Sequence, residues 1–434
     1  GVLEETGRPD FTVFWQPDSP HPDGYTYGWL HCDEDYLYAA VEVTADNTPD
    51  EEDWGALYVM VDGELKEFRI SCDANLWGTD GFQYTPSVIY EHRIYEFQLP
   101  LSEINAHIGD EIYYGFGCYG TVTVDPDEVW VDDNWVGLHL GDPADGHTFG
   151  RDAFATIQNG IAAVHEDGTV HVRAGDYDEH LVIADKSLTL QSTDGWQDTT
   201  IDPMGDSIIR IAGDADVTVQ GFEITAGSWG IYVGEMFSTV NILDCFIHDN
   251  LADGIRVVSG GDLLHIEGNI ISQNGVADSE CGIHIYQAWN TTNILHNVIG
   301  AWWDGEDVGT IYAGNNGDGI RIDDVPAESD VTIRRNLIAE NGDDGIDFPS
   351  VTSVHGSVSI EENAIGAWPC YYEGQDTHSF TGNGNRGIHV AHVSDTGSIN
   401  IEGNAISENG DDGINFGSGV RPIFGEVSIL GNLI

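Results

Sequence analysis

Residues 319–338 read GIRIDDVPAESDVTIRRNLI, and this stretch holds the two phrases that decide the fold. The first phrase, Gly319 to Ile322, alternates two isoleucines with a variable residue, behind a glycine that permits a sharp turn. The second phrase, Val331 to Ile338, has the form Val-x-Ile-x-x-Asn-x-Ile. Because apolar and variable residues alternate, each phrase predicts a short strand with one buried face.

Both phrases recur in strict alternation along the chain. The first phrase begins at Gly230, Gly254, Gly282, Gly319, Gly345, Gly387 and Gly413. These glycines lie 24 to 42 residues apart, which is too short for an independent domain but suits one turn of a β-solenoid. The two longest intervals contain insertions that begin Ile-Gly-Ala-Trp, at Ile299 and Ile365, so the repeat unit is predicted to be one plain and one looped coil.

The asparagine of the second phrase is predicted to form a ladder. It recurs at Asn269, Asn297, Asn336, Asn363, Asn404 and Asn432. Stacked at one place in successive coils, these amides can hydrogen-bond along the stack and satisfy backbone groups at a tight turn, so we expect a structural role and not a catalytic one. Cys245 takes the equivalent place in an earlier coil and is therefore predicted to be buried.

The entry to the repeats supports the same architecture. Residues 152–164 place Phe154, Ile157, Ile161 and Val164 on one helical face, which predicts a short helix that caps the first coil. Shortly after it, residues 168–180 read GTVHVRAGDYDEH. Together the two segments resemble the start of the β-helix in the pectin-lyase-like superfamily, which includes pectin esterases and carbohydrate-binding and sugar-hydrolase repeats. The resemblance covers about residues 130–434 and implies a right-handed parallel β-helix. We therefore expect an all-β chain, with a β-sandwich at residues 1–127 and the β-helix at 128–434.

The front segment shows many short alternating stretches between Gly, Pro and Asp turns, which predict an antiparallel β-sandwich. Its phrases DEDYLYAAVEVTADNTPDEEDW, VMVDG and YEFQLPLSEI resemble carbohydrate-binding modules of family nine. The resemblance implies stacking of sugars on aromatic faces, for which Trp54, Trp77 and Tyr84 are candidates, with plain packing as the alternative.

An acidic loop in the same segment is a candidate calcium site. It contains Asp46, Asp50, Glu51, Glu52 and Asp53, whose oxygens suit Ca²⁺, although a solvated acidic loop is the alternative. Calcium is the one cofactor that the sequence suggests.

The charge excludes several partners. Lys and Arg number 14 against 75 Asp and Glu, a formal net charge of -61 that is spread along the whole chain. Such a surface repels nucleic acid and anionic lipid, so we expect no nucleic-acid binding. No apolar run is long enough to span a bilayer, and we expect no membrane insertion. A first residue of Gly instead of Met fits a mature exported chain or a fragment, and we expect an extracellular protein of the cell envelope.

Six cysteines are candidates for disulfides: Cys32, Cys72 and Cys118 in the front segment, and Cys245, Cys281 and Cys370 in the repeats. Each segment holds an odd number, so complete oxidation would require a bridge between the segments or between chains. The alternative is that several of them are small buried apolar residues.

The sequence contains partial matches to the catalytic motifs of enzymes with this fold. Pectin esterases share the motif Gly175-x-Tyr177-x-Glu179, but their other motifs have no convincing match. The pairs Asp343-Asp344 and Asp411-Asp412 precede the repeat glycine periodically, which favours a structural role.

Polysaccharide lyases of this fold need Ca²⁺ and a basic residue, and Arg321 with Asp323 and Asp324 is the best available set. Exposed strand positions with local ion pairs are the alternative. His284 and His389 take the variable strand position and are expected to point outward, without a third ligand at the spacing of a metal site.

Two functions remain. The sequence favours a structural component of a cell envelope, such as a surface layer, sheath or fibre, in which copies of the chain assemble through a rigid β-helix and the sandwich docks on glycan. The duplicated coil pair, the odd cysteines and the interruption of the second copy at Ile434 favour this interpretation. The alternative is a secreted lyase or glycoside hydrolase that acts on acidic polysaccharide.

Overall fold

The computed structural model divides into two compact units, residues 1–125 and 126–434, which are described separately. The expected boundary between residues 127 and 128 lies two residues away. The structure describes residues 11–15, 24–48, 53–61, 64–71, 75–85, 87–88, 90–107, 110, 112–119, 126–138, 142–150, 152–276, 280–303, 311–349, 354–366, 368–372, 375–417 and 425–434.

The first unit is an antiparallel β-sandwich, as predicted. One sheet has the strand order β1 (Phe11–Trp15), β2 (Gly24–Cys32), β3 (Tyr36–Val43), β7 (His92–Pro100) and β6 (Gly78–Gln83). The other has the order β5 (Glu64–Ser71), β4 (Trp54–Val61) and β8 (Tyr113–Tyr119). Residues of both sheets, including Val41, Leu57, Ile70 and Phe97, form one buried core, because each strand turns alternate side chains inward.

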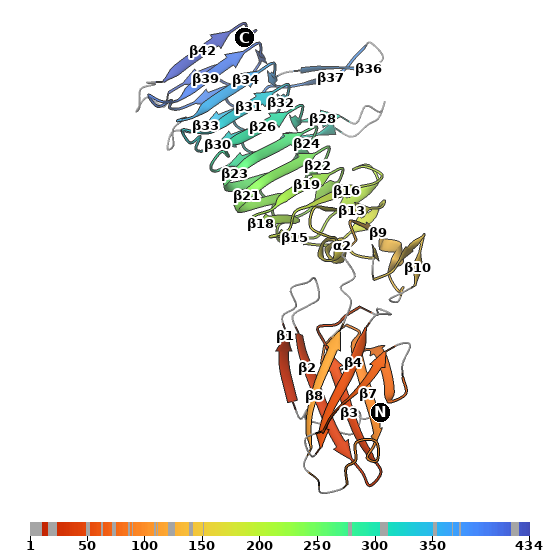
Figure 1. Ribbon diagram of the computed structural model, residues 1–434. Helices are drawn as coiled ribbons and strands as arrows, with labels where there is room; N and C mark the ends of the chain where they lie inside the picture. The colour runs from red at the N-terminus through yellow and green to blue at the C-terminus, as the bar shows by residue number, and fades with distance from the viewer. Residues whose placement is uncertain are drawn as a thin grey trace. The chain divides into compact units, whose positions relative to one another are not determined.

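The second unit is a parallel β-helix of three sheets, in which each coil contributes one strand to each sheet (Figure 1). The first sheet, built from the Gly-Ile phrases, contains β15 (Leu181–Ala184), β18 (Ile209–Ala212), the start of β21 (Ile231–Leu243), the start of β23 (Ile255–Glu267), β25 (Ile283–Ile285), β30 (Ile320–Ile322), β33 (Ile346–Phe348), β38 (Ile388–Val390) and β41 (Ile414–Phe416).

The second sheet is built from the start of the second phrase. It contains β9 (Glu128–Val131), β13 (Gly168–Val172), β16 (Leu188–Ser192), β19 (Asp216–Gln220), the ends of β21 and β23, β26 (Thr291–Leu295), β31 (Asp330–Arg334), β34 (Ser357–Glu361), β39 (Ser398–Glu402) and β42 (Glu426–Leu430).

The third sheet has nine strands. They are β14 (Gly175–Tyr177), β17 (Thr199–Ile201), β20 (Glu223–Thr225), β22 (Phe246–His248), β24 (Ile270–Ser272), β27 (Val298–Gly300), β32 (Leu337–Ala339), β35 (Ala364–Gly366) and β40 (Ala405–Ser407). The apolar residues of all three sheets point inward and form one continuous core, of which Ile283, Ile294 and Ile299 represent a single coil.

The predicted asparagine ladder is confirmed at the corner between the second and third sheets. Each side-chain amide donates to the Oδ1 atom of the next ladder asparagine, at 2.9 to 3.0 Å from Asn269 through Asn432. The same Oδ1 atoms also accept the backbone N–H of the preceding asparagine, as Asn336 does from Asn297 at 2.9 Å. Cys245 occupies the start of this ladder and is fully buried, as predicted.

A second asparagine ladder at the corner between the third and first sheets was not predicted. It consists of Asn250, Asn274, Asn315, Asn341, Asn383 and Asn409, whose amides are linked at 2.9 to 3.0 Å. Four of these residues stand in Asn-Gly pairs, which is the signal in the sequence that could have revealed the ladder.

The corner itself is made by a residue in the left-handed region. The residue before each first-ladder position, for example His296, Arg335 and Glu362, has φ between 50° and 73°. Such a φ turns the chain sharply and interrupts the strand pairing, so the asparagine that follows satisfies backbone groups that the turn leaves open.

The capping helix is α2 (Ile157–Ala163), shorter than the predicted 152–164. Glu179 accepts hydrogen bonds from the backbone N–H groups of Ile157 and Gln158, at 2.8 and 3.0 Å. The esterase-like motif therefore holds the helix on the first coil through Glu179. A Cβ atom on Gly160 would lie 2.8 Å from Val131, so the helix packs closely on β9.

The smaller elements lie at the entry and at the two insertions. The entry contains η1 (Asp133–Trp135), the pair β10 (Pro143–Ala144) and β11 (His147–Thr148), and β12 (Ala153–Phe154). Each Ile-Gly-Ala-Trp insertion forms an antiparallel hairpin, β28 (Trp302–Trp303) with β29 (Ile311–Tyr312) and β36 (Trp368–Tyr372) with β37 (Gln375–Phe380). The hairpins project from the side of the coils (Figure 1). Among the described residues, no helix is long and apolar enough to cross a membrane.

We predict that Asn336→Ala lowers the free energy of unfolding of the protein by about 2–3 kcal/mol, because it leaves buried donors of Asn297 and the carbonyl of Ile294 without a partner. Chemical denaturation of the whole chain measures this change. The matched control is Asn400→Ala, whose exposed amide only reaches Glu402 at 3.4 Å and whose loss should change stability by less than about 0.5 kcal/mol. Equal stability of the two variants would contradict a stabilising ladder.

Candidate functional site

The central residue of each strand in the first sheet points away from the core and stacks on its counterpart in the next coil. We call this stack the outer column. It runs through Arg210, Tyr232, Arg256, His284, Arg321, Asp347, His389 and Asn415. Since parallel strands lie about 4.8 Å apart, ionisable groups in adjacent coils are brought within contact distance.

Aspartates just before the repeat glycine flank this column. One oxygen of each joins adjacent coils: Asp253 accepts the backbone N–H of Cys281 at 2.7 Å, and Asp318 accepts that of Asp344 at 2.9 Å. Asp344 does the same for Arg386 at 2.7 Å. This structural use of Asp344 agrees with the interpretation of Asp343-Asp344 as a turn feature. The second oxygen of each aspartate is left to meet the outer column.

Five side chains from four coils form a chain of ion pairs that we call the Arg321 network. Arg321 Nε donates to Asp323 at 2.9 Å, and its NH1 atom lies 3.6 Å from Asp347. His284 Nε2 lies 3.2 Å from the other oxygen of Asp323, and His389 Nδ1 lies 2.7 Å from Asp347. Acidic and basic groups therefore alternate along the network, and every contact except the first joins residues of different coils.

The structure brings together two of the three predicted catalytic residues. Arg321 and Asp323 are in contact, whereas Asp324 accepts from Gln287 at 3.4 Å. Asp347 was not predicted as a site residue, although it stands at the position of Arg321 in the next repeat, which is the signal that could have found it. Arg334 and Arg335, the other arginines of this coil, pair instead with Glu362, at the end of the second-sheet strands.

The ionisation of the site is set by burial and by these pairs. Burial, followed by the charge of Asp347, raises the pKa of Asp318 to about 7. Burial opposes ionisation of Asp323, but hydrogen bonds from His284 and Arg321 outweigh it and lower the pKa of Asp323. Burial also acts to lower the pKa of Arg321, but contact with Asp323 outweighs it, so the guanidinium stays charged with a raised pKa.

Aromatic residues continue the outer column toward the N-terminal coils. The guanidinium of Arg256 lies 5.3 Å from the ring of Trp229 and 4.8 Å from that of Tyr286. Tyr286 also stacks on His284 at 4.2 Å, and Tyr232 contacts Trp229 at 5.8 Å. A pocket lies between the segments that join the first and second sheets in three successive coils. Its lining includes Gln287, the direct neighbour of Tyr286. Rings with an apolar face and a polar edge therefore adjoin the ionic network.

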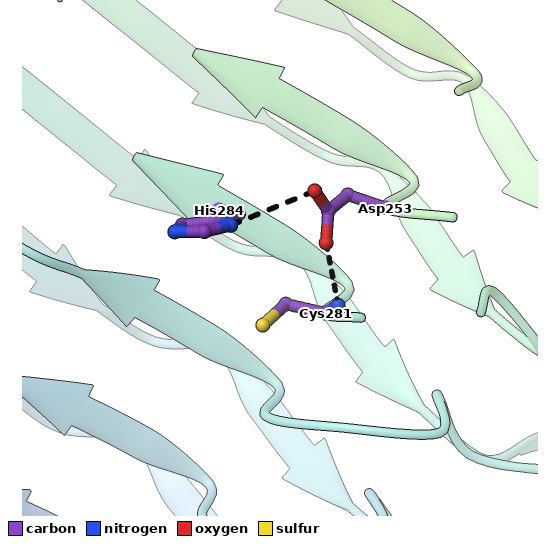
Figure 2. Close-up of side chains that lie close together, drawn as sticks. All are labelled: Asp253, Cys281 and His284. Atoms are coloured by element: carbon purple, nitrogen blue, oxygen red, sulfur yellow. Dashed lines mark hydrogen bonds and ion pairs between the residues drawn. The ribbon is translucent and has the colours of Figure 1, made fainter. Parts of the chain in front are cut away.

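Three groups of side chains in the described residues could hold a metal ion. They are Asp253 with Cys281 and His284, Asp344 with Asp347 and His389, and Asp318 with Asp343 and Asp344, each with its ligand atoms within 4.8 Å of one another. Figure 2 shows the first group, in which Asp253 faces both other residues from the adjacent coil. His284 and His389 have no third ligand at the spacing of a metal site in the sequence, and their possible co-ligands come instead from neighbouring coils.

The predicted sugar-binding residues of the front unit lie in different environments. Trp54 is covered by the guanidinium of Arg69, which lies 3.7 Å from its ring. Trp77 packs edge-on against Phe68 at 5.2 Å and contacts the core. Tyr84 is 63% exposed. The likeness of this unit to carbohydrate-binding modules stays a prediction.

The predicted calcium loop stays a prediction, and the structure describes two of its acidic residues. The side chain of Arg93 lies against Asp53, 4.0 Å from Asp46 and 3.1 Å from Asp80. Asp46, Asp53 and Arg93 are buried, so the guanidinium balances charge on these two carboxylates. Asp50, Glu51 and Glu52 lie outside the described residues.

The cysteines include buried thiols. Cys245 donates toward the carbonyl of Leu243 at 3.2 Å, and Cys281 donates toward Asp318 at 3.9 Å. Neither forms a disulfide, and Cys32 and Cys118 are also thiols. For Cys245 and Cys281 the structure therefore favours the alternative of small buried residues. Cys72 and the side chain of Cys370 lie outside the part of the chain that the structure describes.

Comparison with known proteins supports the fold. The family model described as the right-handed β-helix region matches residues 183–301, so this part of the chain is a right-handed parallel β-helix. The sequence matches no curated protein.

Two solved structures are similar at low identity. The catalytic unit of the thermostable GH87 α-1,3-glucanase from Streptomyces thermodiastaticus strain HF3-3 aligns with 98% of this chain and 96% of its own at 12% identity, with a TM-score of 0.29. Pectin methylesterase PemA from Erwinia chrysanthemi aligns with 60% of this chain and 88% of its own at 13% identity, with a TM-score of 0.37. Neither likeness bears on the activity of this chain.

We predict that Arg93→Met destabilises the protein by about 3–5 kcal/mol, because it leaves the buried carboxylates of Asp46 and Asp53 without their guanidinium. Arg69→Met, which removes an exposed partner of Glu67, is the control and should cost no more than about 1 kcal/mol. Thermal unfolding of both full-length variants checks this. Restoration of the Arg93→Met protein by Ca²⁺ would show that the acidic loop is a cation site after all.

We further predict that iodoacetamide at pH 8 modifies the exposed Cys32 but not Cys245 in the folded protein, because burial raises the pKa of the Cys245 thiol to about 12. Peptide mapping by mass spectrometry, with and without denaturant, identifies the modified residues. A disulfide at Cys245 would instead leave it unmodified even after denaturation without a reductant.

Proposed function

Because the coils that carry the outer column are those of a right-handed β-helix, we propose that this protein binds a polysaccharide along the column and hydrolyses it at the Arg321 network. The observation that carries the proposal is the placement of two carboxylates, Asp323 and Asp347, on either side of one charged guanidinium. The sequence had suggested a polysaccharide-active enzyme as the alternative function, with Arg321, Asp323 and Asp324 as its residues. Here Asp347 takes the place of Asp324.

The outer column suits an extended chain of sugars. Its side chains repeat at the coil spacing of about 4.8 Å and run in one direction across the first sheet. Trp229, Tyr232 and Tyr286 lie along the column, and such rings can stack on the apolar side of a sugar, although Arg256 and His284 already cover part of Trp229 and Tyr286. The neighbouring guanidinium and carboxylate groups offer charge-assisted hydrogen bonds to its hydroxyls.

Cleavage of a glycosidic bond commonly uses two carboxyl groups, one to protonate the leaving oxygen and one to activate water or attack the sugar. Asp323 and Asp347 supply such a pair across successive coils, and the half-buried Arg321 contacts both. Because its pKa is lowered, Asp323 suits the ionised role, and the proton-donating role falls to Asp347. His284 and His389 contact the opposite oxygen of Asp323 and of Asp347, respectively, and orient them. A lyase would instead need an uncharged base, and the raised pKa of Arg321 disfavours that role.

A neutral polysaccharide suits the site better than the acidic one first considered. The formal net charge of -61 repels polyanions. In addition, Arg256 and Arg321 already pair with Asp253 and Asp323, so a uronic acid would have to displace a carboxylate.

The structural role predicted from the sequence, with assembly of copies into an envelope and docking on surface glycan, stays a prediction, as does the extracellular location. No described contact in the chain bears on assembly, whereas the outer column presents groups that can act on a sugar chain.

We predict that the full-length protein releases reducing ends from at least one of a set of neutral glucans, xylans and mannans. Asp347→Asn and Arg321→Ala should each lower the rate by roughly 100-fold or more, because they remove a reacting carboxyl group or the cation that holds it. Arg334→Ala is the matched control, since this arginine pairs with Glu362 away from the first sheet, and it should keep the full rate.

Three results would contradict the proposal: no release from any neutral or acidic polysaccharide, unaltered release by a folded Asp347→Asn variant, or unsaturated products that indicate elimination.

A further inference from the structure

We propose that Asp253, Cys281 and His284 form a binding site for a transition-metal ion of the zinc class on the outer face of the first sheet (Figure 2). The site lies one coil before Arg321 and shares His284 with the Arg321 network, but neither Asp347 nor Arg321 is needed to form it.

The β-helix register brings these three residues together. Cys281 and His284 flank the repeat glycine of one coil, and Asp253 comes from the coil before, where it occupies the position of Cys281. The backbone N–H of Cys281 donates to one oxygen of Asp253 at 2.7 Å, which fixes the carboxylate. The other oxygen then faces His284, with Nδ1 at 3.6 Å.

The donor set is that of a zinc site. A sulfur, an imidazole nitrogen and a carboxylate oxygen lie within 4.8 Å of one another, and ligand atoms on one tetrahedral zinc ion lie roughly 3–4 Å apart. Small side-chain movements therefore suffice for coordination. The other two groups of possible ligands contain no sulfur, and softer transition metals prefer sites with a thiolate.

The surroundings of His284 support coordination through Nδ1. Its other nitrogen, Nε2, lies 3.2 Å from Asp323, which sets the ring orientation in the way that carboxylates orient metal-bound histidines. The ring also stacks on Tyr286 at 4.2 Å, which further restricts its rotation. All three ligands are buried, with exposed fractions of 1% for Asp253, 0% for Cys281 and 7% for His284, so the site is held rigidly.

The charges near the site also permit a cation. Asp318 lies 3.9 Å from the sulfur of Cys281 and can take a fourth position, for which water is the alternative ligand. Arg256 contacts Asp253 at 3.0 Å and would have to leave that oxygen to the metal. Its guanidinium already lies against the rings of Trp229 and Tyr286, which can retain it. Coordination replaces the thiol proton of Cys281, which passes to solvent.

The test uses the full-length protein, freed of metal with a chelator and titrated with Co²⁺. We expect one Co²⁺ per chain with the near-ultraviolet charge-transfer band of a cobalt–thiolate bond, and loss of the band when Zn²⁺ is added. Cys281→Ser should abolish the band. Cys245→Ser, which removes a thiol equally buried in the same unit but in none of the three candidate metal groups of the described residues, is the matched control and should retain it.

A second variant keeps the test decisive if Cys281→Ser does not fold. Asp253→Asn retains the oxygen that accepts the Cys281 N–H and removes the charge, so we expect folded protein with Co²⁺ affinity lowered roughly 10-fold or more. The proposal is overturned if the wild-type protein shows no thiolate band, if a folded Cys281→Ser variant keeps the band, or if Asp253→Asn binds Co²⁺ as tightly as the wild type. Hydrolysis of polysaccharide, measured separately with and without Zn²⁺, does not enter this decision.

Discussion

The structure depends on the exact stacking of one coil on the next, and the asparagine ladders enforce that register. At each corner a residue in the left-handed region interrupts strand pairing, and the following asparagine bonds both to the backbone and to its counterpart in the adjacent coil. A shift by one residue would bury polar groups without partners, which costs more than any single apolar contact gains. By fixing the register, the two ladders also place all the remaining side chains of a coil above the equivalent side chains of the coil before.

Because of this register, equivalent side chains of successive coils form columns along the β-helix. In a chain with only 14 lysines and arginines, Arg210, Arg256 and Arg321 stand in one column of the first sheet, and Arg386 lies beside it. Their carboxylate partners include the aspartates whose first oxygen joins adjacent coils. The same residues thus stabilise the coils and create the buried ionic strip from which the candidate catalytic and metal sites are built.

The front unit also brings together charged residues that lie far apart in sequence. Buried carboxylates need a positive charge nearby. Arg93, on strand β7, provides it to Asp46 and Asp53. An acidic segment read on its own suggests calcium, because the cation that completes it lies about forty residues away in sequence. The distinction between a metal site and a structural ion pair is therefore made by packing and not by the acidic segment itself.

The sequence by itself determined the β-helix, its coil length, the first ladder, the position of the two insertions and the sandwich, because these follow from local periodicity and from turn residues. Arg321 and Asp323 were also found this way, since they are two residues apart. Only the tertiary structure showed that Asp347 contacts Arg321 and that Arg93 pairs with buried carboxylates. It also showed that His284 and Cys281 lie beside Asp253 of the coil before. The repeat phrases show which positions stack, but they do not show which side chains in neighbouring coils make contact, because those residues lie far apart in sequence and meet only through the packing of the folded chain.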